Sequence, residues 1–384
     1  VEHFGLKRRV RNIKNHCPDA TAQCASKPYA RVVCYLMIEQ SGVPAGINQP
    51  QVENWLSTNI AGASAPFTYS LIAGGHSNLT FLVTDANNTK FVLRRPPLSH
   101  ALASAHDMGR EFRVISALQD SPVPVAPALG LCTDVAVNDA PFYVMGFVEG
   151  LIVRDQETAM SKMTPASRRR ASTSRVETMA AIHSVVPAEV GLGELGRHEG
   201  YIERQLKRWY GQWNASKTRE LPAIDRVHDE LLKRIPHQGP ATIVHGDYRL
   251  DNCMISAAGD IAAVLDWELC TLGDPLADLG LLMVYWTGPD DEPAANSFAT
   301  TTAEGFFNRS ELATHYAKVS GRDISHLDFY ISFAFWKLAC IIEGVYARYI
   351  SGAMGEHDPQ SFDAFRVQVE TAAAKAESLL ARLH

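Results

Sequence analysis

The chain has 384 residues, of which 46% are hydrophobic, and its formal net charge is −6. This length and apolar content suffice for one large or two medium globular domains with buried cores. Acidic and basic residues are interspersed, so the sequence shows neither a nucleic-acid footprint nor a polybasic membrane anchor. We therefore expect no nucleic acid and no membrane among the partners, and small polar or acyl substrates remain open.

No apolar run approaches the roughly 18 to 20 residues that span a bilayer, and no secretory signal is recognisable at the N-terminus. We therefore expect a cytoplasmic protein. The seven cysteines contain no C-x-x-C pair, which favours reduced thiols over a zinc knot or a disulfide framework.

The first 47 residues differ from the rest of the chain. Five basic residues cluster between Lys7 and Lys14, and Pro18 and Pro28 interrupt the segment that follows. Such a cluster is typical of a solvated arm. We interpret residues 1–47 as a leader outside the fold.

A sheet-rich region is predicted next. Apolar residues recur at helical spacing over 51–60, and alternation typical of strands covers 68–72, 79–84 and 90–95. A helix over 108–118 precedes a proline-rich connector and short strands over 130–132 and 141–148. We assign residues 48–147 to an N-lobe built on a small antiparallel sheet.

The remainder of the chain has mainly helical periodicity, over 165–183, 200–214, 330–349 and 362–383. Residues 241–267 are the exception and predict two strands around a turn at 257–260, and residues 287–304 predict a surface loop. We assign residues 148–384 to a larger helical C-lobe. The predicted fold class is therefore α+β, with two lobes.

The strongest chemical signal is the sequence His-Gly-Asp-Tyr-Arg-Leu-Asp-Asn over 245–252, followed by an apolar strand that ends at Asp266. Phosphoryl transfer needs a carboxylate that accepts the proton of the attacking hydroxyl, and oxygen ligands that hold magnesium against nucleotide phosphates. Asp247 supplies the first, and Asn252 and Asp266 supply the second. Glu268 faces the same way as Asp266 in an extended chain and is a further metal candidate. The alternative is that these acids only cap helices and turns.

These residues resemble the aminoglycoside phosphotransferase and choline kinase superfamily, which shares the protein-kinase fold and uses H-G-D-x-x-x-x-N as its catalytic sequence. The resemblance covers roughly residues 50 to 384. It implies ATP and Mg²⁺ as cofactors, Asp247 as the catalytic base, and Asn252 and Asp266 as magnesium ligands. His245 is expected to brace the catalytic loop.

The same resemblance implies a basic residue at the end of the third strand that anchors the nucleotide phosphates. Arg94 fits this position, and Arg95 is a close competitor. Glu111, on the following helix, is expected to pair with this cation.

Two further segments match the family's nucleotide site. Gly75, Ser77 and Asn78 lie in a loop between two strands that suits close approach to phosphates. Phe147 and Val148 correspond to the interlobe hinge, where backbone groups are expected to hydrogen-bond adenine.

A narrower resemblance involves Gly-Leu-Gly-Glu-Leu-Gly-Arg over 191–197 and Asp-Trp-Glu-Leu over 266–269. Both look like the kinase-type domain that some proteins carry fused to an acyl-CoA dehydrogenase. No dehydrogenase sequence follows here, so we expect the kinase-like unit to stand alone. Arg208 and Trp209, with Arg197 and Arg204, are candidates for an anionic substrate pocket, although such a helix is more often structural.

Taken together, the sequence predicts a transfer of the ATP γ-phosphate to a hydroxyl of a small molecule, either aminoglycoside-like or a hydroxyacyl compound. Two alternatives stay open. One is a nucleotide-binding pseudokinase that acts as a regulatory module, and the other is a metal-dependent phosphoesterase. The sequence predicts no oligomeric state.

Overall fold

A computed structural model of the chain describes residues 42–74, 78–98, 107–288, 291, 299–352 and 362–383. Residues 1–41 of the predicted leader lie outside this part, as do Gly75 and Ser77 and most of the predicted loop at 287–304. Gly46 and Ile47 belong to the predicted leader but contact the N-lobe. Arg95 donates to the Gly46 carbonyl at 2.6 Å, and Ile47 packs on the core of the sheet.

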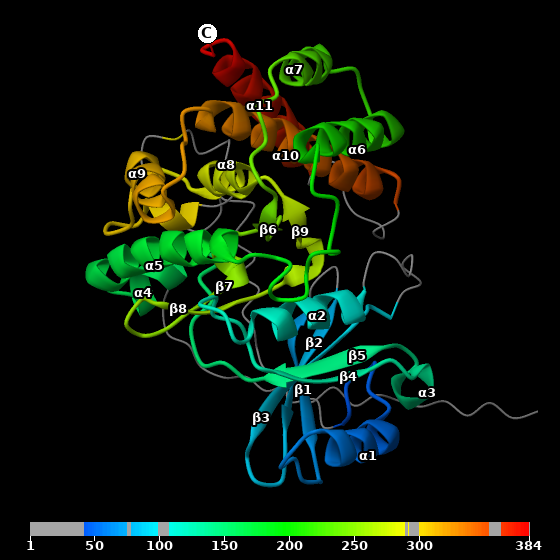
Figure 1. The fold of residues 1–384 in the computed structure, drawn as a ribbon. Helices are drawn as coiled ribbons and strands as arrows, with labels where there is room; N and C mark the ends of the chain where they lie inside the picture. Colours follow the sequence, from blue (N-terminus) through cyan, green and yellow to red (C-terminus); the bar gives the residue numbers. More distant parts are fainter. Residues whose placement is uncertain are drawn as a thin grey trace, which may run out of the picture. The chain divides into compact units, whose positions relative to one another are not determined.

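The N-lobe is built on one antiparallel sheet whose strands follow the order β1-β2-β3-β5-β4 (Figure 1). The central strands carry apolar residues on both faces, because helices pack against both sides of the sheet. The bounds of β2 and β3 are those that the sequence predicts. The strands are β1 (Thr68–Gly74), β2 (Leu79–Thr84), β3 (Lys90–Arg95), β4 (Ala128–Cys132) and β5 (Phe142–Gly146).

Helices cover both faces of the sheet. Val52 and Leu56 of α1 (Gln49–Asn59) share a core with Leu93 on one face. On the other face, α2 (Met108–Leu118) packs beside Tyr143 of β5. Neighbouring residues of a strand point to opposite faces, so adjacent strand residues enter different cores. The short helix α3 (Val135–Asn138) lies between β4 and β5.

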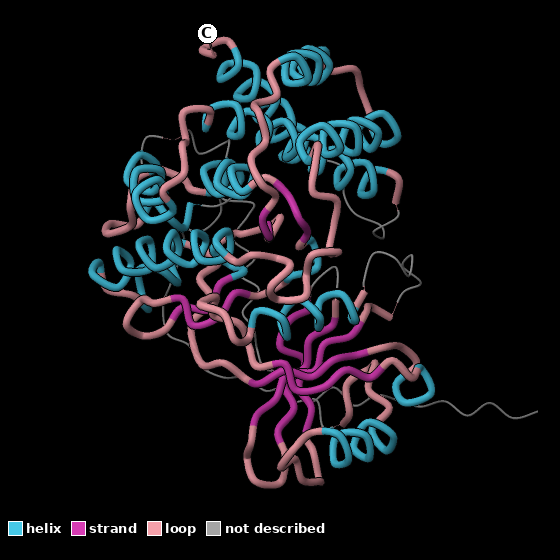
Figure 2. Tube along the Cα trace, in the orientation of Figure 1, coloured by secondary structure: helices cyan, strands magenta, loops and turns pink. Residues whose placement is uncertain are grey.

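The C-lobe is mainly helical, as predicted, and its strands come in two pairs near the sheet of the N-lobe (Figure 2). The long helix α10 is central, since it packs against α6, α8 and α11. The helices are α4 (Gln156–Lys162), α5 (Pro165–Ser184), α6 (Tyr201–Ser216), α7 (Pro222–Lys233), α8 (Pro275–Tyr285), α9 (Arg309–Ser320), α10 (Leu327–Ile350) and α11 (Asp363–Leu380).

The predicted strand pair within 241–267 is more elaborate in the structure. A hairpin of β7 (Cys253–Ile255) and β8 (Ile261–Val264) encloses the predicted turn, while β6 (Thr242–Val244) pairs instead with β9 (Thr271–Gly273). The β6–β9 pairing links segments on either side of the hairpin and therefore depends on tertiary contacts. Within the predicted loop after 287, residues Ala299–Thr302 form a short 3₁₀ helix.

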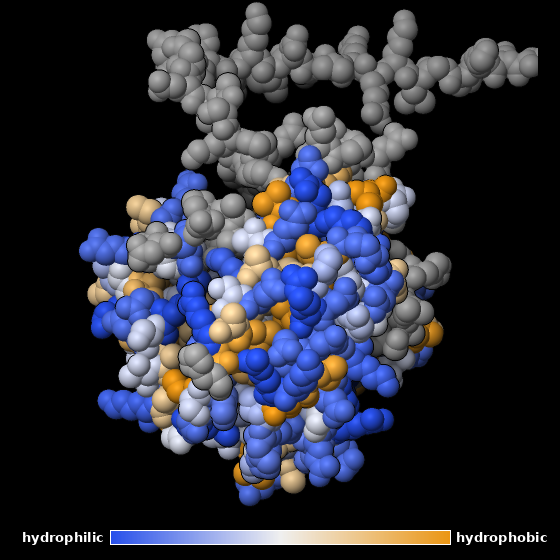
Figure 3. Space-filling model, turned by 90° about the horizontal axis from the view of Figure 1, so that it is seen from above, coloured by the Kyte–Doolittle hydropathy of each residue, from blue (hydrophilic) through white to orange (hydrophobic). Residues whose placement is uncertain are grey.

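Among the described residues, α10 alone is long and apolar enough, by length and composition, to cross a membrane. The expectation from the sequence that no apolar run approaches the length of a bilayer span is therefore wrong for this helix. Of its apolar window, 67% is buried inside the fold, and a core helix passes the same test. The surface in Figure 3 is mostly hydrophilic, with apolar side chains in smaller patches.

The N-lobe core predicts a matched pair of stability effects. Leu93 is fully buried, whereas Leu71 on β1 is 48% exposed. We expect Leu93→Ala to lower the free energy of unfolding by about 2–5 kcal/mol, because it leaves a cavity. Leu71→Ala should change it by no more than about 0.5 kcal/mol. Urea unfolding of both variants measures the difference, and equal losses would contradict the assigned packing.

Candidate active site

Strand β6 leads directly into the loop that carries the predicted catalytic base. At the start of this loop, the backbone N–H groups of His245 and Gly246 donate to the two carboxylate oxygens of Asp278, at 2.6 and 2.9 Å. Asp278 lies on α8 and is buried. One carboxylate thus fixes two successive peptide groups, which is an architectural role.

Gly246 gives the loop its path. Its φ is +84°, in the region that favours glycine, and a Cβ atom added there would lie 2.9 Å from the Leu269 carbonyl oxygen. Any other residue would therefore force the two backbone segments apart.

His245 braces the loop through both ring nitrogens. Nε2 lies 2.9 Å from the Leu265 carbonyl oxygen, which can only accept, so Nε2 carries the proton. Nδ1 then accepts from the backbone N–H of Asp247 at 3.3 Å. The ring is fully buried against Tyr248 and Trp267. These contacts are those of a bracing residue, as the sequence predicts.

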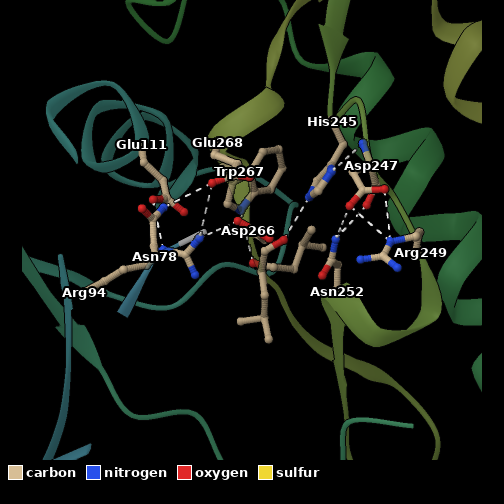
Figure 4. Close-up of polar contacts among 12 residues, drawn as sticks. Asn78, Arg94, Glu111, His245, Asp247, Arg249, Asn252, Asp266, Trp267 and Glu268 are labelled. Atoms are coloured by element: carbon tan, nitrogen blue, oxygen red, sulfur yellow. Dashed lines mark hydrogen bonds and ion pairs between the residues drawn. The ribbon is translucent and has the colours of Figure 1, made fainter. Parts of the chain in front are cut away.

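Asp247 is held by neighbours in its own loop (Figure 4). Arg249 Nε lies 3.1 Å from its carboxylate. The amide of Asn252 donates to the carboxylate at 3.0 Å and to the Asp247 carbonyl at 2.8 Å. The Asp247 side chain remains 23% exposed, so it is oriented and still accessible to solvent.

Asp266 follows β8 in an unusual backbone conformation. Its φ is +63°, which is uncommon for a residue other than glycine and concentrates at functional sites. The next residue, Trp267, is buried and donates from its indole nitrogen to the Val264 carbonyl at 3.1 Å. The turn thereby directs the Asp266 carboxylate toward the N-lobe, where it contacts Arg94 (Figure 4).

Arg94 connects the two lobes. Its Nε lies 3.1 Å from Glu111 on α2, and one terminal nitrogen contacts Asp266. Burial raises the pKa of the Glu111 carboxyl, and the Arg94 charge opposes this effect. Arg95 points to the opposite face of β3 and donates to the carbonyls of Gly46 and Asn138. Of the two candidates, Arg94 therefore lies in the site.

Glu268 and Asn78 extend this polar cluster. The Asn78 amide donates to Glu268 at 3.1 Å, and a terminal nitrogen of Arg94 lies 4.0 Å from the same carboxylate. Burial and the nearby Asp266 raise the pKa of Glu268 to about 7. Asn78 is buried, and its Oδ1 has no hydrogen-bond partner among the described residues.

The donor chemistry of this cluster fits a magnesium ion bound together with a nucleotide. Among the described residues, no three His, Cys, Asp or Glu side chains are grouped to hold a metal by themselves. Mg²⁺ commonly takes only one or two carboxylates and completes its shell with phosphates and water. Here the carboxylates of Asp266 and Glu268 lie close enough together that the Asp266 charge helps to raise the pKa of Glu268. Arg94 partly neutralises both carboxylates.

The other predicted nucleotide contacts are placed only in part. Phe147 and Val148 directly follow β5, at the passage from the sheet to the C-lobe, and Lys90 lies 5.2 Å above the Phe147 ring. Gly75 and Ser77 lie outside the described residues.

Two buried cations were not anticipated from the sequence. Arg175 of α5 is fully buried, contacts the Tyr248 carbonyl and lies 3.1 Å from the Cys253 sulfur. It braces the loop that carries Asp247, but it is one of several arginines in a polar helix and gives no distinctive signal. Lys337 lies in α10 beside Trp209. A single lysine within an apolar helix was a signal that could have been noticed.

Curated relatives cover most of this chain. Acyl-CoA dehydrogenase family member 10 of Mus musculus is 35% identical over 72% of this chain and 26% of its own length. Acyl-CoA dehydrogenase family member 11 of Homo sapiens is 32% identical over 80% of this chain and 40% of its own length. The chain therefore spans well under half the length of these relatives. The predicted resemblance to proteins of this group is confirmed.

Solved structures give the same fold. A Ralstonia eutropha protein assigned as an aminoglycoside phosphotransferase is 31% identical, with a TM-score of 0.73 over 86% of this chain and 98% of that chain. The GDP complex of aminoglycoside 2'-phosphotransferase-IIIa, at 13% identity and a TM-score of 0.57, covers 85% and 99% and is similar in fold alone. The predicted two-lobed, kinase-like fold class is thus confirmed.

The sequence pattern of the phosphotransferase enzyme family matches residues 68–315. This range runs from β1 into α9 and includes Arg94, Asp247 and Asp266. More than half of the chain is therefore covered, and the protein belongs to the phosphotransferase enzyme family.

Proposed function

We propose that the protein is an ATP-dependent kinase that transfers the γ-phosphate to a hydroxyl of a small molecule. One observation carries the proposal: Asp247, held in a braced loop, lies beside a second cluster in which Arg94 joins Glu111 to Asp266. The first part suits activation of a hydroxyl, and the second suits the binding of phosphates.

In the proposed reaction, the acceptor hydroxyl lies against the Asp247 carboxylate, which takes its proton as the oxygen attacks the γ-phosphorus. The bond to the β-phosphate oxygen breaks, and ADP leaves with that oxygen. Arg249 and Asn252 keep Asp247 oriented for this step. Because these contacts already restrict the Asp247 side chain, less of its conformational freedom has to be lost when the reaction begins.

The nucleotide would lie between the lobes. Arg94 would contact its phosphates while Glu111 keeps the guanidinium in place, and Asn78 would approach them from the loop after β1. Asn252, Asp266 and Glu268 would hold Mg²⁺, which neutralises charge on the phosphates when it is bound. The backbone at Phe147 and Val148 is the proposed adenine contact. A cytoplasmic location, where ATP and Mg²⁺ are available, is part of the same proposal.

The acceptor class is supported by two kinds of relative. Solved structures of similar fold include phosphotransferases with kanamycin or hygromycin B. The curated relatives above 30% identity carry acyl-CoA dehydrogenase in their names. Because these relatives are far more similar in sequence than most of the antibiotic enzymes, a hydroxyacyl compound is the preferred acceptor over an aminoglycoside.

The role of Asp247 predicts a selective loss of chemistry. We expect Asp247→Asn to lower kcat by about 10²–10⁴-fold, because the amide cannot accept the proton, while the affinity for Mg²⁺·ATP changes little. Asp260→Asn is the control, since Asp260 lies in the β7–β8 turn with its side chain 47% exposed and pairs with Arg170. Acceptor-stimulated ADP release and calorimetry with ATP measure the two effects. A variant that loses affinity for ATP but turns over normally once ATP is bound would contradict the role of Asp247 as the base.

The role of Asp266 predicts a metal-dependent binding defect. We expect Asp266→Asn to lower the affinity for Mg²⁺·ATP by about 10- to 100-fold, which is the usual cost of losing a contact between charged groups. The affinity for ATP without metal should fall by less. Calorimetry with and without Mg²⁺ separates the two. Equal affinity of wild type and variant for Mg²⁺·ATP would remove Asp266 from the metal site.

The same assay tests the pseudokinase alternative. ATP binding that no acceptor class converts to ADP release would favour a regulatory nucleotide-binding module. Release of phosphate from a phosphoester without ATP would favour a phosphoesterase.

A further inference from the structure

A cavity of about 240 Å³ lies beside the catalytic loop, between that loop and helices α6 and α10. Its wall includes Gly246, which directly precedes the proposed base, and Glu268 of the proposed metal cluster. The cavity is therefore next to the position where an acceptor hydroxyl would meet Asp247.

Lys337 projects from α10 into the wall of this cavity, although its residue is only 9% exposed. Its ammonium lies 5.5 Å from the centre of the Trp209 ring, and no carboxylate of the described residues lies within ion-pair distance. Burial lowers its pKa, while the Asp247 and Asp278 charges oppose this effect. A poorly solvated ammonium without a paired anion is costly, and a bound anion would offset that cost.

Arg208 adds a second cation on the same aromatic ring. Its guanidinium lies 5.1 Å from the Trp209 ring centre and, within the described part of the chain, it forms no ion pair. Trp209 is itself fixed, because its indole N–H donates to Gln205 at 2.9 Å. Lys337 and Arg208 thus both contact the Trp209 ring, and both line the same cavity.

The charge of the cavity wall is positive in sum. Arg110, Arg208 and Lys337 face it, against the single carboxylate of Glu268. Arg110 is engaged with the carbonyls of Leu195 and Cys270, at 2.8 and 2.9 Å, and contributes charge more than free hydrogen-bond donors. The other two cations keep donors available for a ligand. A cationic acceptor would be repelled here, and an anionic one attracted.

We propose that this cavity binds an anionic group of the acceptor, a carboxylate or a phosphate carried by the same molecule as the reacting hydroxyl. The proposal rests on the proposed kinase function and narrows its acceptor class. Lys337 and Arg208 would bind the anion, while the Trp209 ring packs against the adjoining carbon chain. The anion thereby holds the hydroxyl near Asp247. The predicted Arg204 is not needed for this site, because its guanidinium donates to the Arg197 carbonyl instead.

A binding experiment tests the site without any turnover. Inorganic phosphate and acetate are titrated by calorimetry into the wild type, Lys337→Met and Arg208→Gln. Methionine keeps an unbranched stem over Trp209 and removes the charge. We expect each substitution to lower the affinity for the anion by about 10-fold or more. Whichever of the two anions binds more tightly to the wild type identifies the group that the cavity takes.

Two matched controls make the result specific. Lys375 lies 5.5 Å above the Phe335 ring, as Lys337 does above Trp209, but does not line the cavity. Arg204 lies one turn before Arg208 on α6. Lys375→Met and Arg204→Gln should bind the anions like the wild type. Arg208 is exposed, so Arg208→Gln remains informative if Lys337→Met fails to fold.

A kinetic experiment then links the site to the acceptor. Hydroxy acids are compared with their amides, and sugar phosphates with the parent sugars, by Mg²⁺·ATP-dependent ADP release. We expect kcat/KM to favour the anionic member by about 10-fold or more, and Lys337→Met to remove that preference. No anion binding by the wild type, or equal binding by Lys337→Met and Arg208→Gln, would overturn the site. Anion binding without ADP release from any acceptor would keep the site and overturn the kinase function.

Discussion

The buried carboxylate of Asp278 is the constraint on which the active site depends. It accepts two successive backbone N–H groups of the catalytic loop and also lies 3.4 Å from the ring of His183. Burial alone would raise its pKa, but His183, His245 and the backbone donors hold the pKa of Asp278 below its usual value. Because this charged acceptor satisfies the backbone N–H groups of both His245 and Gly246, it holds the start of the loop in one conformation.

That fixed loop lets a few short contacts define the rest of the site. His245 ties the loop to the end of β8 through Leu265, and Asp266 follows immediately with its unusual φ. Asp266 then contacts Arg94, which is tied to α2 through Glu111. The path from Asp278 to the N-lobe therefore runs through buried and partly buried polar groups. Such networks specify one arrangement only when each member is satisfied.

The charge distribution around Asp247 is asymmetric. Carboxylates of Asp266 and Glu268 gather on the side of the N-lobe, where metal and phosphates are proposed to bind. Lys337 and Arg208 lie on the side of α6 and α10. In the proposed arrangement, an anionic acceptor would lie on one side of Asp247 and the nucleotide on the other, with Glu268 at the border between them. This arrangement would reduce the repulsion that two anions in one pocket would experience.

The sequence by itself determined the elements whose pattern is local. The local patterns predict the strands of the N-lobe, α2 and α5 within about two residues. The spacing from Asp247 to Asn252 predicts the catalytic loop. The tertiary structure decided what depends on distant segments. Alternation along β3 places Arg94 and Arg95 on opposite faces, but only packing shows which face meets Asp266. Lys337 reaches the site because α10 packs beside α6, a contact that no local pattern encodes.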